Sequence, residues 1–429
     1  MTRLEKDLHE LPWGLPGLLR WASTHEVFCV FGGSAAKDLD YAFPHQLALG
    51  VARSFELGMD GSLNDLDAFL CSSEIGYVVQ IGYGLKDHLE KLPSRHLDPI
   101  GFPDLYVFEP VVRIQLLGDR IHIWAPDAAA VWEQILAGRD RLSSTEIPSI
   151  DFQPRSSRAQ YREALEQVLS HIRRGDCYEL NYCQEFYAAG VQLDPVTVYE
   201  RLCAVVQAPF ASFYRNKHRW MMGASPERFL KKQGDRVESR PMKGTAPRDI
   251  HPSVDSELAQ ALQESPKDRS ENIMVVDLVR NDLSRVSKKG TVRVEALCAL
   301  HSFPQVHQLV STVSGQLRSG TGFRNILEAC FPMGSMTGAP KVRVMELTDR
   351  YEYSARGLYS GSVGYLEPNG DFDLNVVIRS LQYNASSGYL SYHVGSGITA
   401  YSDPEKEWEE CLWKSRGIRE ALKKESDEP

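Results

Sequence analysis

The stretch RWMMGASPERFLKKQGDRVESRPMKG, residues 219–244, predicts how this chain begins to fold. Short apolar runs lie on both sides of Gly234 and Asp235, which are residue types that favour a tight turn. The stretch therefore predicts strands that run antiparallel and turn at these two residues. Two registers remain open. A three-residue loop places Glu227 directly opposite Lys243, whereas a two-residue loop leaves the two side chains diagonal and on opposite faces.

Comparable runs toward the N-terminus are rich in β-branched and aromatic residues, which favour strands. They extend the expectation of antiparallel strands to the region before residue 150. A charged segment with several Ser and Pro residues, residues 138–161, then interrupts the apolar pattern. We therefore place a boundary near residue 150, between residues 1–150 and residues 151–429. The strand-like runs are VFCVFGG (27–33), IGYVVQIGYG (75–84), DLYVFEPVVRIQLLG (104–118) and RIHIW (120–124).

A clear amphipathic helix is predicted just after this boundary. Its apolar residues recur at steps of three and four, which is the spacing of one helix face, and Gly175 ends the pattern. The residues on this face are Tyr161, Leu165, Val168, Leu169 and Ile172.

The segment YSDPEKEWEECLWKSRGIREALKK, residues 401–424, predicts another helix near the C-terminus. Ser402 and Glu405 have the spacing of a capping box, and Pro404 falls in the first turn, where its missing N–H costs little. Three charged side chains of this helix are spaced so that they share one face. They are Glu407, Glu410 and Lys414.

The bulk composition is that of a globular protein large enough to bury a substantial core. The chain has 429 residues, of which 42% are hydrophobic and 24% are charged. Its formal net charge of −9 argues against nucleic acid or an anionic membrane as the main partner, because both need a basic face. A small anionic substrate needs only a local cationic pocket, so that class of ligand stays open.

No targeting or membrane-spanning segment is expected. The first residues, MTRLEKDLHELPWG, carry acids early, and the chain has no uninterrupted apolar run of about 18 residues. The eight cysteines are scattered without C-x-x-C spacing, which predicts reduced thiols and neither a disulfide framework nor a zinc site. Together these features predict a cytoplasmic protein.

Two predicted helices each carry a pair of carboxylates three residues apart. Asp268 and Glu271 lie in SPKDRSENIMVVDLVRNDL, residues 265–283, and Glu407 and Glu410 form the second pair. Carboxylate oxygens without His or Cys suit Mg²⁺, a hard cation that keeps several waters. Acidic helix faces are also common on solvated surfaces, so the pattern alone leaves both interpretations open.

Glycine-rich segments recur in the C-terminal half. Glycine lets a backbone approach a ligand closely and offers N–H groups to an anion. The segments are not a Walker phosphate loop, because G-x-x-x-x-G-K-[ST] is absent. Taken singly, each segment is also explained by a tight turn in a β-rich domain. The segments are FPMGSMTGAPKVRVMEL (331–347), YSGSVGYL (359–366) and HVGSGITAYSD (393–403).

Taken in order, these segments resemble the chorismate-utilising enzymes over roughly residues 155–420. The resemblance also rests on GDCYELNY (175–182), SPERF (225–229), RPMKGTAPR (240–248), VHQLVSTVSG (306–315) and VVIRS (376–380). It implies an α/β (α+β) fold like that of anthranilate synthase component I, in which two packed antiparallel β-sheets are flanked by helices. It also implies that the regions before and after residue 150 contribute to one intertwined fold.

Position 243 indicates the branch of the family. The chain reads Pro241-Met242-Lys243-Gly244-Thr245, which is similar to the P-x-K-G-T motif of aminodeoxychorismate synthase component I, whereas anthranilate synthases usually have alanine in place of the lysine. Relatives that form isochorismate or salicylate activate water with a lysine where this chain has Glu179. The resemblance therefore implies that chorismate and ammonia are converted to 4-amino-4-deoxychorismate, in 4-aminobenzoate and folate biosynthesis.

The resemblance also implies roles for individual residues. Lys243 is expected to attack chorismate, Glu227 to act as general acid and base, and His307 to line the ring pocket. A lysine with its ordinary pKa is protonated at pH 7, so burial or a nearby base must help Lys243 to react. The expected substrate-binding residues are Gly244, Thr245, Tyr359, Arg379, Gly395, Ser396, Gly397 and Lys414. The expected Mg²⁺ ligands are Glu271 and Glu410. Asp268 and Glu407 are expected next to these ligands, within reach of waters bound to the metal.

A separate glutamine amidotransferase partner is implied as the source of ammonia. Some relatives bind tryptophan near the N-terminal sheet, and the corresponding candidate pocket comprises Ser34, Tyr41, Pro44, Pro209, Phe210 and Ala211. Two alternatives remain: an anthranilate synthase component I with an atypical lysine, and a catalytically silent subunit that binds chorismate or tryptophan. The presence of Glu227, Lys243, His307, Glu271 and Glu410 together disfavours the silent subunit.

Overall fold

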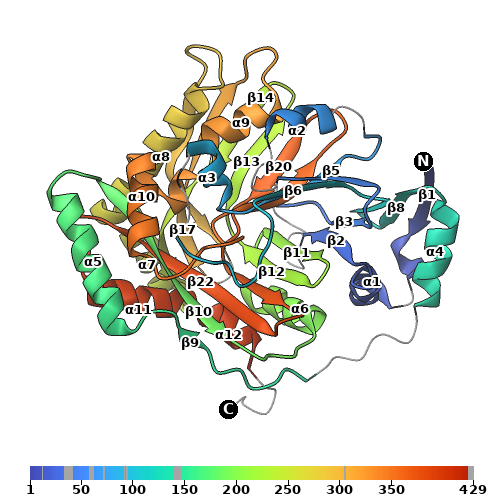
Figure 1. The fold of residues 1–429 in the computed structure, drawn as a ribbon, viewed down its shortest axis with the longest axis horizontal. Coiled ribbons are helices and arrows are strands. Elements are labelled where there is room, and N and C mark those ends of the chain that lie inside the picture. The colour runs from blue at the N-terminus through green and yellow to red at the C-terminus, as the bar shows by residue number, and fades with distance from the viewer. Residues whose placement is uncertain are drawn as a thin grey trace.

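The computed structural model describes residues 1–11, 13–32, 42–57, 62–70, 73–90, 92, 95–138, 146–303 and 306–423. Within these residues the strands form two antiparallel sheets, and helices lie on the outside (Figure 1). The predicted fold class is therefore confirmed. Figure 1 shows α5, α10 and α11 at one side of the molecule, and α1 and α4 at the opposite side, near the N-terminus.

The first sheet has twelve strands in the described part of the chain. Their order is β1 (Thr2–Asp7), β8 (Arg120–Ala125), β7 (Val112–Leu117), β3 (Gln46–Leu49), β2 (Val27–Phe31), β11 (Phe210–Asn216), β12 (Arg219–Ser225), β21 (Ser380–Asn384), β22 (Tyr389–Ile398), β10 (Glu179–Ala188) and β18 (Gly338–Ala339), and β9 (Gln153–Pro154) pairs with β10.

The second sheet has ten described strands. Their order is β15 (Met242–Pro247), β17 (Val306–Gln316), β14 (Arg236–Arg240), β13 (Arg228–Gln233), β20 (Phe372–Asn375), β19 (Ser362–Leu366), β5 (Tyr77–Ile81), β6 (Leu105–Glu109) and β4 (Arg53–Glu56), and β16 (Arg293–Ser302) pairs with β17.

The described helices connect and cover the two sheets. They are α1 (Gly14–Ala22), α2 (Asn64–Phe69), α3 (Leu85–Glu90), α4 (Ala128–Ala137), α5 (Arg158–Arg173), α6 (Pro195–Val206), α7 (Pro252–Glu264), α8 (Pro266–Ser284), α9 (Phe323–Cys330), α10 (Lys341–Tyr351), α11 (Pro404–Lys414) and α12 (Arg416–Ala421), with short 3-10 helices η1 (Leu8–Glu10) and η3 (Gly334–Met336).

Strands from the two sides of residue 150 pair within both sheets. In the first sheet β2 pairs with β11, and in the second sheet β5 pairs with β19. The four N-terminal runs that predict strands contain β2, β5, β6, β7 and β8. The two regions thus share their sheets, and the boundary near residue 150 remains a prediction.

The stretch 219–244 turns as the two-residue loop requires. Gln233 pairs with Arg236 across Gly234 and Asp235, so the three-residue loop is wrong. The stretch is also more than a hairpin, because β12 belongs to the first sheet and β13 to the second. Pro226 and Glu227 form the crossing between them.

Both predicted helices form, but one cap differs from the prediction. Helix α5 covers the apolar face predicted from residue 161 onward and is capped by Ser157. Helix α11 is capped by Asp403, whose carboxylate accepts hydrogen bonds from the backbone N–H groups of residues 405 and 406. The Ser402 hydroxyl instead accepts from the N–H of Thr399, so the predicted Ser402–Glu405 capping box is wrong.

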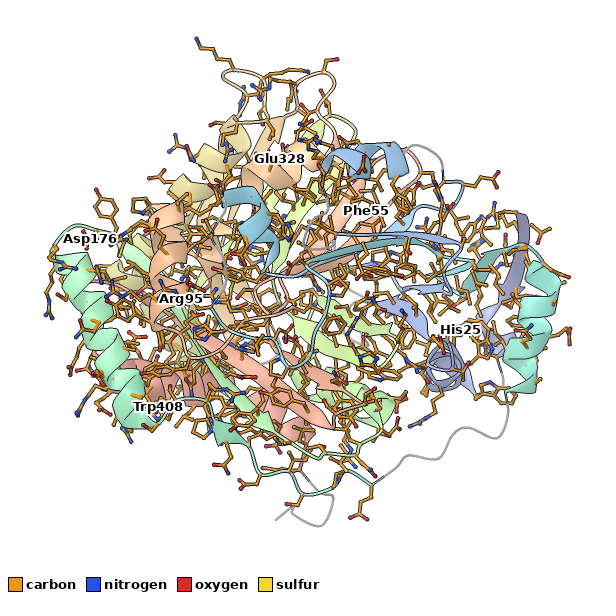
Figure 2. The ribbon with its side chains drawn as sticks, viewed as in Figure 1. His25, Phe55, Arg95, Asp176, Glu328 and Trp408 are labelled. Atoms are coloured by element: carbon orange, nitrogen blue, oxygen red, sulfur yellow. The ribbon has the colours of Figure 1, made fainter. Side chains whose placement is uncertain are left out.

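Packing fixes the position of α11 against the first sheet. Trp408, labelled in Figure 2, lies edge-on to Tyr161 of α5 with ring centroids 5.1 Å apart.

The described cysteines, which exclude Cys71, are free thiols and buried. Among the described helices, none is both long and apolar enough to traverse a lipid bilayer.

Candidate active site

A cavity of about 350 Å³ lies where the two sheets meet. Its walls come from β10 and β22 of the first sheet, from β15 and β17 of the second, and from helices α8 and α11. Strands from opposite halves of the sequence thus supply facing walls. The cavity, here called the central pocket, collects most of the residues predicted to bind chorismate or metal.

Strand β15 carries Lys243 into this pocket through a bulge. The pairing with β17 shifts between Lys243 and Thr245, so Gly244 has no partner of its own. Gly244 has a φ of +82°, and a Cβ there would lie 2.8 Å from the Cβ of Asp268. A bulge re-aims the side chains around it, and here all three residues line the pocket.

Lys243 forms a buried ion pair with Glu179 of β10. The Nζ donates a hydrogen bond to Oε1 of Glu179 over 2.8 Å, and the Glu179 side chain is 2% exposed. Burial by itself lowers the pKa of Lys243, but the charges of Glu179 and Glu271 outweigh this, and the net pKa is raised. Lys243 is therefore protonated at rest, and Glu179 is the group placed to accept its proton.

Glycine at position 397 leaves room for this ion pair. A Cβ at Gly397 would lie 2.8 Å from Nζ of Lys243 and 2.9 Å from Oε1 of Glu179. At Gly395 a Cβ would lie 2.8 Å from the Sγ of Cys183. Both glycines of the G-S-G motif therefore face neighbouring groups at distances that a side chain cannot occupy.

Glu227 reaches the pocket from the crossing between the sheets. Its side chain is 5% exposed, and burial raises the pKa of Glu227 to about 7, although Ser335 and the positive charge of Lys243 favour the ionised form. Near neutral pH this carboxyl group is partly protonated. It can therefore donate a proton as well as accept one.

Carboxylates gather at the α8 and α11 end of the pocket. Asp268, Glu271 and Glu410 line it, and Lys267 Nζ lies 3.9 Å from Oε1 of Glu271. Burial raises the pKa of Glu271 to about 7. Burial would also raise the pKa of Glu410, but Lys414 at 2.7 Å outweighs it and the net pKa is lowered.

The carboxylates of the pocket resemble an open magnesium site more than a closed one. Across the described residues, no three His, Cys, Asp or Glu side chains converge into a metal-binding group. Mg²⁺ needs only one or two protein carboxylates, because it keeps waters and takes ligands from its substrate. The Oε1 of Glu271 is buried and accepts no hydrogen bond, which leaves it free to bind a cation. Glu271 and Glu410 therefore fit an open magnesium site, and they do not fit a closed cage.

Arg379, Tyr359 and His393 also line the pocket, and Arg379 donates a hydrogen bond to the carbonyl of Lys414 of α11 at 2.6 Å. Arg379 has a φ of +52°, which is strained for an arginine and of a kind often found at functional sites. Tyr359 stacks on His393 with ring centroids 5.1 Å apart, and both side chains are buried. The predicted residues Tyr359 and Arg379 therefore line the pocket, together with a histidine that was not predicted.

His307 does not lie in the pocket wall. Its Nδ1 is 2.8 Å from the Ser302 hydroxyl and its Nε2 is 3.0 Å from Asp255, so both ring nitrogens are engaged elsewhere. The next residue, Gln308, lines the pocket. Neighbouring residues of a strand face opposite sides, so Gln308 and not His307 faces the pocket, and the role of His307 in the reaction stays a prediction.

Of three further residues predicted for the site, one lines the pocket and two do not. Ser396 is fully buried but absent from the pocket wall, because it alternates with Gly395 and Gly397 on β22. Glu407 is also buried outside the wall, with Oε1 4.0 Å from Lys267 Nζ. Lys414 does line the pocket and donates to the carbonyl of Gly395.

The candidate tryptophan pocket remains a prediction. Ser34 and Tyr41 fall outside the described residues. Around Phe210 the described space is filled by Phe43, whose ring centroid is 5.1 Å away. The backbone N–H of Phe43 also donates to the carbonyl of Pro209.

The structure adds pocket residues that the sequence did not single out. Glu179 was noted only for replacing a lysine, and its contact with Lys243 depends on two strands 64 positions apart. Thr245 was predicted to line the pocket, and Gln308 is its pairing partner on β17. The alternation of side chains along a strand could therefore have pointed to Gln308 from the sequence. The pocket-lining residues without a predicted role include Asn181, Lys267, Gln308, Ser335, His393 and Trp413.

The fold and the pocket define a chorismate-binding protein. Residues 58–420 match the family described as chorismate binding enzyme, and the chain belongs to this family. It is 37% identical to aminodeoxychorismate synthase component 1 of Klebsiella aerogenes over 347 residues, which cover 80% of this chain and 76% of that protein. It is 35% identical to an anthranilate synthase component I-like protein of Synechocystis over 353 residues, which cover 81% and 72% of the two chains.

A solved structure supports the same fold. Anthranilate synthase component I from Streptococcus pneumoniae superposes with a TM-score of 0.78, covering 89% of this chain and 93% of that one, at 24% sequence identity. At this identity the likeness concerns the fold alone. The choice between the two activities named among the relatives depends on the pocket.

Proposed function

We propose that this protein is an aminodeoxychorismate synthase component I, which converts chorismate and ammonia to 4-amino-4-deoxychorismate. One observation carries the proposal: the Nζ of Lys243 lies inside the central pocket, paired with Glu179 and close to Glu227. Anthranilate formation needs no amine from the protein. A buried lysine beside two carboxylates is the arrangement expected of a nucleophile.

The first displacement begins with a proton transfer. Lys243 passes a proton to Glu179 along their hydrogen bond, which leaves a neutral amine. The amine nitrogen forms a bond to C2 of chorismate, both ring double bonds shift by one position, and the C4–O bond breaks. Glu227 donates its proton to the departing hydroxyl, which leaves as water. The partly protonated state of Glu227 near pH 7 suits this step.

The second displacement reverses the first with a different nucleophile. Ammonia forms a bond to C4, both ring double bonds shift back, and the C2–Nζ bond breaks. Lys243 leaves as a neutral amine, because its nitrogen carries the positive charge in the adduct. That charge passes to the new amino group, so atoms and charge balance.

Binding groups surround this reaction. Arg379 and Tyr359 hold the enolpyruvyl carboxylate, and Gly244 and Gly397 let the ring lie close to the backbone. Glu271 and Glu410 would hold Mg²⁺, which neutralises the ring carboxylate when bound. We further propose a cytoplasmic location, a role in 4-aminobenzoate and folate synthesis, and a separate glutamine amidotransferase subunit as the ammonia source.

The test is turnover of the purified protein with chorismate, Mg²⁺ and an ammonium salt. We expect 4-aminobenzoate only when a 4-amino-4-deoxychorismate lyase is added, and no product from Lys243→Ala. Exposed Lys406 of α11 supplies the matched control, Lys406→Ala, which should keep activity. Anthranilate and pyruvate formed without the lyase would move the protein to the anthranilate synthase branch. No turnover by the folded protein would favour the silent subunit.

A further inference from the structure

A small cavity lies behind Glu227 and is here called the rear cavity. Its volume is about 10 Å³, which is room for about one water molecule. Glu227 and Ser335 line both the rear cavity and the central pocket, so these two residues form the partition between them. Glu227 can therefore exchange a proton on two sides, with the substrate pocket and with the rear cavity.

The rear cavity has the polar wall that a buried water requires. Besides Glu227 and Ser335, its lining includes Ser239 of β14 and Asp282 of α8. A buried water typically makes about three hydrogen bonds to groups of this kind. Because the cavity has room for only about one water, a water in it lies between the side chains of Glu227 and Asp282.

Asp282 is connected toward the surface by Lys341, the first residue of α10. The Asp282 side chain is 7% exposed, and its Oδ2 accepts a hydrogen bond from Nζ of Lys341 over 2.6 Å. The Lys341 side chain is 15% exposed and so has some contact with solvent. Burial raises the pKa of Asp282, although the charges of Lys341 and Arg285 favour its ionised form. Asp282 is therefore easier to protonate than an ordinary aspartate.

The proposed reaction uses one proton of Glu227 in every cycle. Glu227 gives this proton to the departing hydroxyl, and the positive charge of the adduct leaves on the new amino group. Glu179 returns its proton to Lys243, so that pair resets itself. Glu227 instead ends the cycle as a carboxylate, and its side chain is only 5% exposed. A proton from solvent must reach it before the next cycle.

We propose that this proton reaches Glu227 from the rear, through Lys341, Asp282 and a water in the rear cavity. The inference rests on the proposed function. The Lys341 ammonium passes a proton to Asp282, Asp282 passes one to the water, and the water gives one of its own to Glu227. Lys341 then regains a proton from solvent. Each relay group ends unchanged, and Glu227 is the net acceptor.

Asp282→Asn tests the relay, because asparagine keeps the shape of the side chain but has no carboxyl proton to pass on. The assay is rapid-quench product formation at pH 6 with chorismate, Mg²⁺ and saturating ammonium chloride. Glu227 is mostly protonated at this pH, because its pKa is about 7. The first product per active site should therefore form at the wild-type rate. Later turnovers should be roughly tenfold or more slower, with a larger solvent isotope effect in D₂O.

Ser239→Val tests the water and leaves the Asp282–Lys341 ion pair in place. The added methyl group fills a cavity with room for about one water, whereas the control Ser239→Ala leaves the cavity open. The valine variant should show the same fast first turnover followed by slow ones, and the alanine variant should lose much less. If Asp282→Asn does not fold, the valine variant decides the question by itself.

Two results would overturn the proposal. A purely structural role of the Asp282–Lys341 pair would slow the first and the later turnovers equally. A wild-type steady rate in both Asp282→Asn and Ser239→Val would show that Glu227 takes its proton from the central pocket. If the wild-type protein forms neither the Lys243 adduct nor product, the proposed function fails, and that result is distinct from a failure of the relay.

Discussion

Two buried ion pairs of this protein are built in opposite ways. Arg356 donates to both carboxylate oxygens of Glu352 at 2.9 and 2.6 Å and to the carbonyls of Met336 and Asn181 at 2.7 and 2.8 Å. Its remaining N–H reaches the Ser360 hydroxyl. All five N–H groups of this guanidinium have acceptors, and the pair lies outside the wall of the central pocket.

The Lys243–Glu179 pair leaves hydrogen-bonding capacity unused. Lys243 donates one hydrogen bond, and Oε2 of Glu179 is buried without a partner. Glu271 Oε1 and Gln308 Oε1 are unpaired in the same pocket. Fully satisfied buried networks make a structure rigid, whereas unsatisfied groups in a cavity mark where a ligand binds. The contrast is the reason why we propose a structural role for the first pair and a functional role for the second.

The largest effect is expected from breaking the functional pair. Lys243→Met should lower turnover by on the order of a thousandfold or more, because the proposed adduct forms through this amine. Glu179 would then stay buried without its partner, so stability should also fall, and turnover is compared per folded molecule. The assay is product formation with saturating ammonium, with Lys406→Met as the control. Substantial residual turnover would show that Lys243 is not the nucleophile.

Breaking the structural pair should act on stability. Arg356→Met leaves Glu352 buried without its partner and should lower the free energy of unfolding by about 3–5 kcal/mol. Urea unfolding measures this change. Turnover per folded molecule should fall far less than in Lys243→Met. The double variant Arg356→Met/Glu352→Gln should recover part of the stability, and no recovery would argue against an unpaired charge as the cause.

The two raised carboxyl pKa values predict how pH acts on stability. Glu227 and Glu271 have pKa values of about 7 in the folded chain, against about 4.3 when unfolded. Between pH 4.3 and pH 7 the folded chain binds more protons than the unfolded chain does. The contribution of Glu227 and Glu271 to the free energy of unfolding is therefore complete below about pH 4.3 and is lost as pH rises through about 7.

Glu227→Gln removes this dependence at one site. It should be more stable than wild type at pH 8.5 by roughly 3 kcal/mol, and the gain should vanish near pH 4.5. Urea unfolding across this range is the measurement. In wild type the adduct-forming rate should also fall above pH 7, because Glu227 then lacks the proton that it donates. An equal gain at both pH values would contradict the raised pKa.

The smallest expected effect is a change in Mg²⁺ affinity at the α8 and α11 end of the pocket. Lys267 lies 3.9 Å from Glu271 and 4.0 Å from Glu407, where it offsets negative charge that would attract a cation. Lys267→Met should therefore tighten Mg²⁺ binding a few-fold, and Glu271→Gln should weaken it by about tenfold or more. Calorimetry with MgCl₂ measures both without turnover. Unchanged affinity in both variants would place the metal elsewhere.

Sequence reasoning predicted elements best where the signal was local. The helix from residue 161, the turn at Gly234 and the placement of Lys243 in the pocket follow from spacing or from a contiguous motif. An error arose at a single position of an otherwise correct segment, because Asp403 caps α11 in place of Ser402. The structure also shows that Gln308, and not its neighbour His307, lines the pocket. A shift of one residue changes the side of a strand, and local sequence does not specify that shift.

By itself the sequence determined an antiparallel α/β protein with a lysine in a long family motif and two carboxylate helices, because turns, periodicity and long motifs act over short distances. The tertiary structure decided which residues meet. The bulge at Gly244 set the side chains of β15, the crossing at Glu227 joined the two sheets, and β10 brought Glu179 to Lys243. These contacts depend on pairing between strands distant in the chain, so the partner of Lys243 emerges only when the sheets pack.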